Sequence, residues 1–116
     1  MESIALTRLI EKMKLENLTP EIDLSDIHIT QPDINRPALQ LTGYFEHFDA
    51  TRLEIIGFVE HTFMAGLPDE RKREIYDEFM SYDLPAVVFC RELKPDPIFV
   101  ESALVHRIPL LSTKKP

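Results

Sequence analysis

The segment AVVFC, residues 86–90, is apolar at every position. A strand with one face in water alternates apolar and polar side chains, because successive side chains point to opposite faces. An uninterrupted apolar run is typical of a strand covered on both faces, as the strands of parallel sheets are. This segment therefore predicts a sheet enclosed between layers of helices.

Three further segments are predicted to be strands. The run RLEIIGF, residues 52–58, is rich in β-branched residues and ends at Gly57. The run IPLLS, residues 108–112, is a short apolar strand near the C-terminus. Residues 26–29 alternate Asp, Ile, His and Ile, which is the pattern of a half-buried strand.

The clearest helices lie between these strands. Pro68 opens a helix over residues 68–83, with acids in its first turn, and Pro85 ends it. Its predicted buried face consists of Ile75, Tyr76, Phe79 and Met80. Asp96 and Pro97 are the N-cap and first residue of a second helix that runs to about His106. Its predicted inner face consists of Ile98, Phe99, Ala103 and Leu104.

Two weaker helical patterns complete the prediction. Ser3 can cap a first helix, whose apolar stripe at i, i+3, i+4 and i+7 consists of Leu6, Leu9, Ile10 and Met13. Residues 59–66 form a short helix that ends at Gly66. We expect Val59, Phe63 and Met64 to lie together on one side of this helix.

The order of elements from residue 52 onward is strand, helices, strand, helix, strand. Such alternation implies right-handed crossovers and a largely parallel sheet. The 116 residues suffice for one domain. The sequence therefore predicts a single three-layer α/β domain over residues 1–112, with a mainly parallel sheet flanked by helices. Residues 113–116 are predicted to be a tail or a truncated linker.

The charge balance argues against two classes of partner. Lys and Arg number 13 against 20 Asp and Glu, a net charge of -7. Nucleic acids and anionic membrane surfaces both bind basic faces, so neither is an expected partner. No apolar run approaches the roughly 20 residues that span a bilayer. A single cysteine, Cys90, and an N-terminus with interleaved charges favour a cytoplasmic location.

Several kinds of active site are excluded or disfavoured. Each glycine is followed by Tyr, Phe or Leu, so no Gly-Lys pair can form a phosphate-binding P-loop. The four histidines are scattered without helical i, i+4 spacing, so we predict no metal site. Cys90 lacks the neighbouring residues of a nucleophile turn and is better interpreted as a buried strand residue. We predict no catalytic residues on this chain.

The segment QPDINRPALQLTGYFEHF, residues 31–48, holds the best candidates for ligand binding. Arg36 lies in an irregular loop, and Arg91 follows the strand 86–90, where a parallel sheet opens its ligand crevice. A guanidinium suits carboxylate or phosphate, so Asn35, Arg36 and Arg91 are candidate anion-binding residues. The alternative is that these arginines pair with neighbouring acids, and that Asn35 closes an Asx-type turn that anchors the loop.

The sequence also resembles a known family. The segments DINRPALQLTGYFEHFDATRLEIIGFVEHTFM, YDLPAVVFCREL and RIPLLST are similar to the N-terminal domain of HPr kinase/phosphorylase. The matching positions are Arg36, Pro37, Gly43, Tyr44, Phe45, Arg52, Gly57, Pro85, Arg91, Pro109 and Leu111. Cys90 stands where the family usually has Ser or Thr.

The resemblance implies a fold like the first domain of the muramyl peptide ligases. It also implies a bacterial parent enzyme, usually a hexamer, that phosphorylates a serine of the protein HPr with ATP or pyrophosphate and removes that phosphate in carbon catabolite control. The family's ATP and magnesium sites lie in a separate C-terminal kinase domain, so no cofactor is expected on this chain. HPr, the kinase domain of the same parent chain and further copies of the protein are the implied partners.

Two functions are therefore expected. The first is a non-catalytic regulatory or assembly domain of an HPr kinase/phosphorylase. The second is a stand-alone ligand-sensing α/β module that binds a nucleotide-sugar or another anionic metabolite. A self-contained enzyme is the weakest interpretation, because no nucleophile–base pair can be identified.

Overall fold

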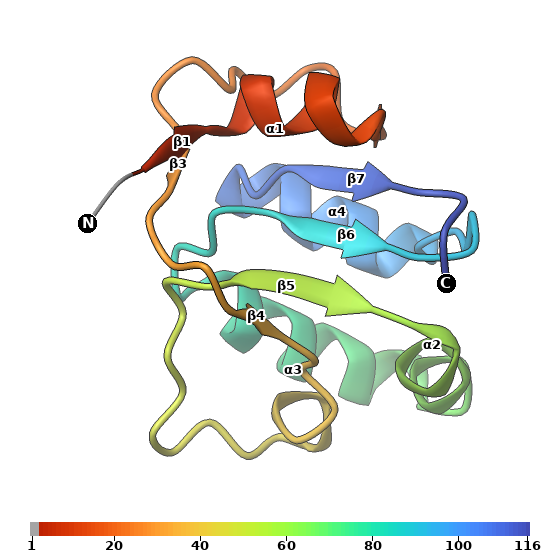
Figure 1. The fold of residues 1–116 in the computed structure, drawn as a ribbon. Coiled ribbons are helices and arrows are strands. Elements are labelled where there is room, and N and C mark those ends of the chain that lie inside the picture. Colours follow the sequence, from red (N-terminus) through yellow and green to blue (C-terminus); the bar gives the residue numbers. More distant parts are fainter. Residues whose placement is uncertain (1–2) are drawn as a thin grey trace.

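A five-stranded sheet lies at the centre of the structure, a computed structural model that describes residues 3–116 (Figure 1). In spatial order its strands are β2 (Glu16–Asn17), β7 (Leu110–Ser112), β6 (Val87–Phe89), β5 (Leu53–Ile56) and β4 (Ile34–Asn35). The pairs β4–β5, β5–β6 and β6–β7 are parallel, whereas β2 runs antiparallel to β7. The sheet is mainly parallel, as predicted. Its three longest strands, β5, β6 and β7, lie within the segments that were predicted to be strands.

A small two-stranded ribbon lies outside this sheet. It consists of β1 (Ile4–Ala5) and β3 (His28–Ile29), which pair antiparallel with Ile4 opposite Ile29. The predicted strand at residues 26–29 therefore exists, but it is shorter and belongs to the ribbon. The predicted N-cap at Ser3 is wrong, because the ribbon occupies residues 4–5 and the first helix starts at Leu6 without a side-chain cap.

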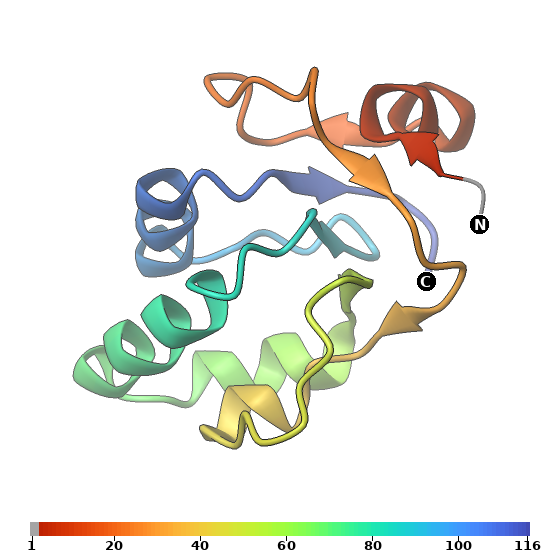
Figure 2. The same ribbon diagram turned by 90° about the vertical axis from the view of Figure 1, so that its left-hand side faces the viewer.

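Helices cover the two faces of the sheet, which gives the three layers (Figure 2). The two long helices, α3 (Asp69–Met80) and α4 (Pro97–His106), lie on one face, and α1 (Leu6–Met13) lies on the other. The helix α2 (Phe58–Ala65) follows β5 directly, and a 3₁₀ turn, η1 (Gln40–Thr42), packs near α3. Asp96 accepts a hydrogen bond from the Phe99 N–H, which confirms the predicted N-cap of α4.

An aromatic core fills the space between the sheet and the two long helices. The Phe99 ring lies 4.9 Å from that of Tyr76 and 5.3 Å from that of Phe89, both edge-on, and all three residues are fully buried. The predicted buried face of α3 is confirmed at all four positions. On α4, Phe99 and Ala103 are buried as predicted, while Ile98 and Leu104 are only partly buried.

The core on the α1 side is smaller. Its buried members are Leu6, Ile29, Ala86, Val88 and Leu111. Leu9 and Ile10 of the predicted stripe pack against this cluster, but Met13 at the end of α1 remains 44% exposed. The sheet is therefore covered less completely on this face than on the face of α3 and α4.

The predicted orientation of α2 is partly wrong. Met64 is buried as expected, but Val59 and Phe63 are 68% and 43% exposed. Val59 and Phe63 are four residues apart and share a helix face, whereas Glu60 and Met64 share the face that points inward. The buried acid Glu60 decides which side of α2 turns to the sheet.

The last residues of the chain continue alongside the end of β6. The Thr113 N–H donates to the Phe89 carbonyl, and the carbonyls of Thr113 and Lys115 accept from the Glu92 and Arg91 N–H groups at 2.9 Å. The expected domain boundary at residue 113 stays a prediction. None of the helices within residues 3–116 has the length and apolarity needed to cross a membrane.

Asp96 joins the two long helices and is expected to be a strong determinant of stability. Its side chain caps α4, accepts a hydrogen bond from the Tyr76 hydroxyl at 3.0 Å and lies 3.6 Å from the Lys72 ammonium. Asp96→Ala should lower the free energy of unfolding by about 2 kcal/mol, measured by urea titration. Asp96→Asn keeps an oxygen for the cap and should lose less. Equal losses in the two variants would contradict this role of the cap.

Candidate functional site

The carboxyl ends of the parallel strands bring three residues distant in sequence to one edge of the sheet. Arg36 follows β4, Gly57 follows β5 and Cys90 follows β6. In open α/β sheets this edge is where ligands bind. The predicted candidates Asn35, Arg36 and Arg91 all belong to these strand ends or to the residues directly after them.

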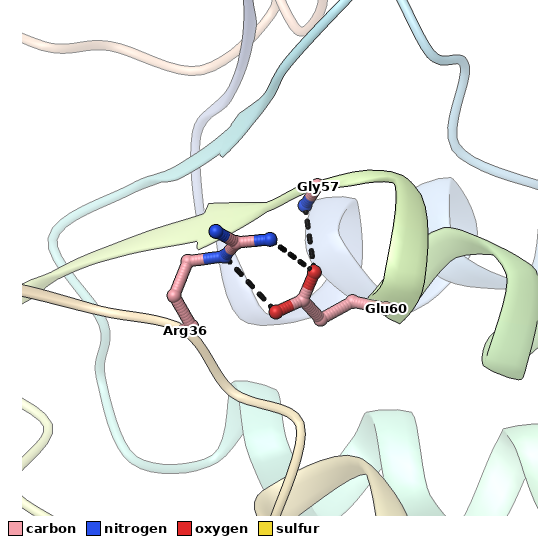
Figure 3. A network of polar contacts seen from close by, with 3 residues as sticks. All are labelled: Arg36, Gly57 and Glu60. Atoms are coloured by element: carbon pink, nitrogen blue, oxygen red, sulfur yellow. Dashed lines mark hydrogen bonds and ion pairs between the residues drawn. The ribbon is translucent and has the colours of Figure 1, made fainter. Parts of the chain in front are cut away.

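Arg36 forms a two-pronged ion pair with Glu60 of α2 (Figure 3). Its Nε donates to Glu60 Oε2 at 3.0 Å, and its Nη2 donates to Oε1 at 2.7 Å. The Gly57 N–H donates to the same Oε1 at 3.0 Å. This arrangement ties the loop after β4 to the first turn of α2, which is the loop-anchoring alternative that the sequence left open.

Gly57 makes room for this pair. A Cβ atom at this position would lie 2.2 Å from Arg36 Nη2, so the guanidinium would have to move from its place beside Glu60. The backbone of Gly57 is extended, with φ at -103°, so the requirement for glycine comes from the close approach of the guanidinium. Gly57 and Arg36 therefore depend on one another.

The pair is electrostatically asymmetric. Glu60 is 4% exposed and Arg36 is 51% exposed at the side chain. Burial acts to raise the pKa of the Glu60 carboxyl, but the hydrogen bonds from Arg36 and from nearby backbone N–H groups outweigh it and leave the pKa below its usual value. The hydrogen bond to Glu60 raises the pKa of Arg36. The exposed side of the guanidinium is the part that could meet an anion.

Asn35 lies in a second polar network. Its Nδ2 donates to Glu54 Oε1 at 2.7 Å and to Gln40 Oε1 at 3.3 Å, and its Oδ1 accepts from Arg52 Nη2 at 3.2 Å. The predicted Asx-type turn is wrong, because its bond would need an N–H two residues on, where Pro37 has none. Asn35 instead joins the strands β4 and β5 through side chains.

Glu54 in the middle of β5 is a buried acid that the sequence analysis did not single out. The residue is completely buried, and burial raises the pKa of its carboxyl to about 7, against the opposing effects of Asn35 and Arg52. Its Oε2 has no hydrogen-bond partner among the described residues. Glu54 shares its strand face with the buried Ile56, and this two-residue spacing was the signal that could have identified it.

Arg91 and Cys90 take no part in these networks. Arg91 is exposed, adopts a left-handed backbone with φ at 56°, and its side chain makes no hydrogen bond or ion pair within the described part of the chain. Cys90 is 8% exposed, and burial raises the pKa of its thiol although Arg36 and Arg91 act to lower it. A buried, protonated thiol is a poor nucleophile. Ligand binding by Asn35, Arg36 and Arg91 stays a prediction.

The residues do not fit a nucleotide–magnesium site. Within residues 3–116, no three His, Cys, Asp or Glu side chains are grouped so that they could hold a metal ion. The glycine after β5 is followed by Phe58, without the lysine of a phosphate loop. The expectation that ATP and magnesium bind outside this chain stays a prediction.

A family model described as the HPr serine kinase N terminus matches residues 4–116. The chain belongs to this family. The resemblance identified in the sequence is thus confirmed, and the match includes every strand and helix described above.

Curated relatives of this HPr kinase N-terminal domain are longer proteins. The HPr kinase/phosphorylase of Lachnoclostridium phytofermentans is 48% identical over 115 residues, which cover 99% of this chain and 37% of that protein. The HPr kinase/phosphorylase of Caldanaerobacter subterraneus is 38% identical with the same coverage. The one from Streptococcus uberis is 31% identical over 97% of this chain and 36% of that protein. The chain spans little more than a third of the relatives that it matches.

A solved structure shares the fold of this HPr kinase N-terminal domain. It holds the CBS and DRTGG domains of the regulatory region of Clostridium perfringens pyrophosphatase, complexed with the activator diadenosine tetraphosphate. The TM-score is 0.60 at 14% identity, and the match covers 97% of this chain and 42% of that one. At this identity the likeness shows a common fold.

Gly57→Ala should disrupt the ion pair by excluding Arg36 from its place. Glu60 would then remain buried without its cation, so we expect a loss of about 2–3 kcal/mol in the free energy of unfolding, as for Arg36→Ala. The double variant should lose much less free energy of unfolding than the sum of the losses in Gly57→Ala and Arg36→Ala, because each change removes the same ion pair. Urea unfolding of all three variants measures this coupling.

Gly66→Ala is the matched control for this prediction. Its Cβ would meet no atom closer than 3.5 Å, and its φ of -84° suits any residue. The control should change stability by less than about 0.5 kcal/mol. Additive losses in Gly57→Ala and Arg36→Ala would show that the two residues act separately.

Glu54 should make the stability of the domain depend on pH. Its pKa of about 7 in the folded state exceeds the ordinary 4.5, so the unfolded state ionises first as pH rises. The contribution of the protonated Glu54 carboxyl to the free energy of unfolding is complete below about pH 4.5 and is lost as the pH rises through 7. The free energy of unfolding should fall by at most about 3 kcal/mol over this range. Glu54→Gln should remove this decline, as urea titrations at pH 5 and pH 8 would show. The exposed Glu21→Gln should leave it unchanged, and a decline that persists in Glu54→Gln would assign it to another group.

Proposed function

We propose that this chain is a non-catalytic regulatory and assembly module of a bacterial HPr kinase/phosphorylase. The observation that carries the proposal is the match of the whole domain to about a third of each relative, within a family defined by the N terminus of the enzyme. In this proposal the parent enzyme acts on a serine of HPr in the cytoplasm. Its separate kinase domain binds ATP and magnesium, and the present domain influences how copies of the enzyme associate.

The outward face of α2 supports the assembly role. Phe58, Val59 and Phe63 are 60%, 68% and 43% exposed, and the neighbouring outward residue Thr62 carries no charge. Together the three side chains expose on the order of 300 Å² of apolar surface, which is comparable to the largest apolar patch on a typical monomeric protein, and such patches are often functional. Two copies of a chain with net charge -7 repel each other over most of their surface, so an uncharged apolar face is where a second copy can make contact without opposing like charges.

The size of this face limits how strong such an association can be. A stable dimer buries about 800 Å² on each partner, so contact through α2 alone should be weak. Weak contacts become effective when other parts of the same polypeptide hold copies close together. The α2 face therefore fits an accessory contact within a larger assembly.

A ligand-sensing role is the second candidate. The regulatory region with the same fold is named as complexed with a nucleotide activator, diadenosine tetraphosphate. On the present chain, the half-exposed guanidinium of Arg36 and the exposed Arg91 are cations at the sheet edge where such folds bind ligands. A rise in melting temperature with nucleotides, sugar phosphates or UDP-sugars, absent in Arg36→Ala, would favour this role.

Self-association through α2 can be tested on the isolated chain. Sedimentation equilibrium from about 10 μM to about 1 mM should show an average mass that rises with concentration, since the contact is weak. Val59→Asp should abolish the rise, because it places a charge in the apolar contact. Val105→Asp is the matched control: Val105 is 72% exposed on α4, and its replacement should leave the rise intact.

Two results would contradict the proposal. A wild-type chain that stays monomeric over the whole range would remove the assembly role. Phosphorylation of HPr by this chain alone with ATP would remove the non-catalytic assignment.

A further inference from the structure

An apolar groove lies on the face of the sheet that α1 covers. It has a volume of about 480 Å³ and is bounded by α1, by the segment that leads into β4, and by the C-terminal residues. Most of its lining is aliphatic, with Ile55 and Val88 from the sheet, Leu9 and Met13 from α1, and Ile34 at its outer side. The eight-residue α1 lies nearer β7 and does not extend over β4 and β5 (Figure 1).

A second hollow, lined by lysines, lies next to the groove. It has a volume of about 590 Å³ and contains the four lysines Lys12, Lys14, Lys114 and Lys115. Glu16 and Glu92 also line it, so the surrounding side chains still carry an excess of positive charge. None of the four lysines forms an ion pair with an acid within the described residues.

The two hollows are adjacent. Met13, Leu15, Thr113 and Lys115 line both of them, so the lysine hollow lies directly beside the apolar groove. Each has a volume typical of small-molecule sites, which are mostly apolar with a few polar groups that orient the ligand. The chain thus combines an apolar trough with a cationic end.

The placement of these lysines is unusual for this chain. The net charge is -7, yet four of the 13 basic residues and only two acids line this one hollow. Lys12 and Lys14 also complement the negative end of the α1 dipole. Lys114 and Lys115 lie beyond β7, outside any helix, so the helix dipole does not account for them.

We propose that this combined site binds a small amphipathic anion, a molecule with an apolar chain or ring and a carboxylate or phosphate head. The apolar body lies in the groove against Ile55 and Val88, where its burial removes aliphatic surface from water. The head lies among the lysines, where it meets the positive charge. This site is distinct from Arg36 and Glu60, and it does not depend on the assembly role proposed above.

Cys90 provides a built-in reporter of occupancy. It is the single cysteine of the chain, it lines the apolar groove, and it is 8% exposed. A ligand in the groove would cover the thiol and slow its reaction with a small alkylating agent. The reporter therefore reads the apolar part of the site.

The probes are the dye 8-anilinonaphthalene-1-sulfonate, which joins apolar rings to an anion, and decanoate as a competitor. We expect the folded chain to enhance the fluorescence of the dye, decanoate to displace it, and both to slow the alkylation of Cys90. Inorganic phosphate has no apolar chain and decanol has no negative charge, so each should compete poorly with the dye. Met13→Asp and Ile34→Asp should each weaken binding, since both residues line the groove and are already 44% and 52% exposed.

Charge-reversal variants test the lysine end. Lys12→Glu combined with Lys114→Glu should weaken binding of dye and decanoate by about tenfold. Arg8→Glu combined with Lys94→Glu changes the net charge equally at exposed positions outside both hollows and should leave affinity unchanged. Equal effects of the two double variants, or an unchanged rate of Cys90 alkylation at saturating decanoate, would overturn the proposal.

Discussion

The structure depends on one constraint, which is that the apolar central strands must be covered on both faces. The three residues of β6 are all buried, and β6 lies between β5 and β7 in the sheet. Because their side chains point to both faces of the sheet, helices are needed on both faces to cover them. On one face, α3 and α4 meet this demand with a closely packed aromatic core. On the other face, the eight-residue α1 meets it only in part. The apolar groove is the part of this face that α1 does not cover.

The carboxyl edge of the sheet is organised by a second interaction. The pair between Arg36 and Glu60 fixes the start of α2 relative to the loop after β4, and Gly57 allows it by lacking a side chain. Because Glu60 turns inward, the opposite side of α2, with Phe58 and Val59, turns outward. A buried acid therefore produces an exposed apolar surface, and the loop anchor and the proposed contact face are consequences of the same geometry.

Much of the fold could be predicted because it depends on local patterns. The periodicity of α3, the Asp96–Pro97 start of α4 and the strand order from residue 52 onward all follow from side-chain spacing and capping chemistry. The two-residue strands β2 and β4 could not be predicted, since they carry no apolar run and exist only because a neighbouring strand offers hydrogen-bond partners. The start of α1 at Leu6, rather than after Ser3, depends likewise on the pairing of Ile4 with Ile29.

The candidate site likewise has features that the sequence predicts and features that only the structure shows. The amino-acid sequence by itself determined the α/β class, the family, and the position of Arg91 just after the strand at residues 86–90. Only the tertiary structure decided that Glu60 is the partner of Arg36, that Glu54 is buried beside Asn35, and that lysines from the two ends of the chain share one hollow. The physical reason is distance along the chain: periodicity and capping act over a few residues, whereas a charge 24 positions away becomes a partner only after the sheet has formed.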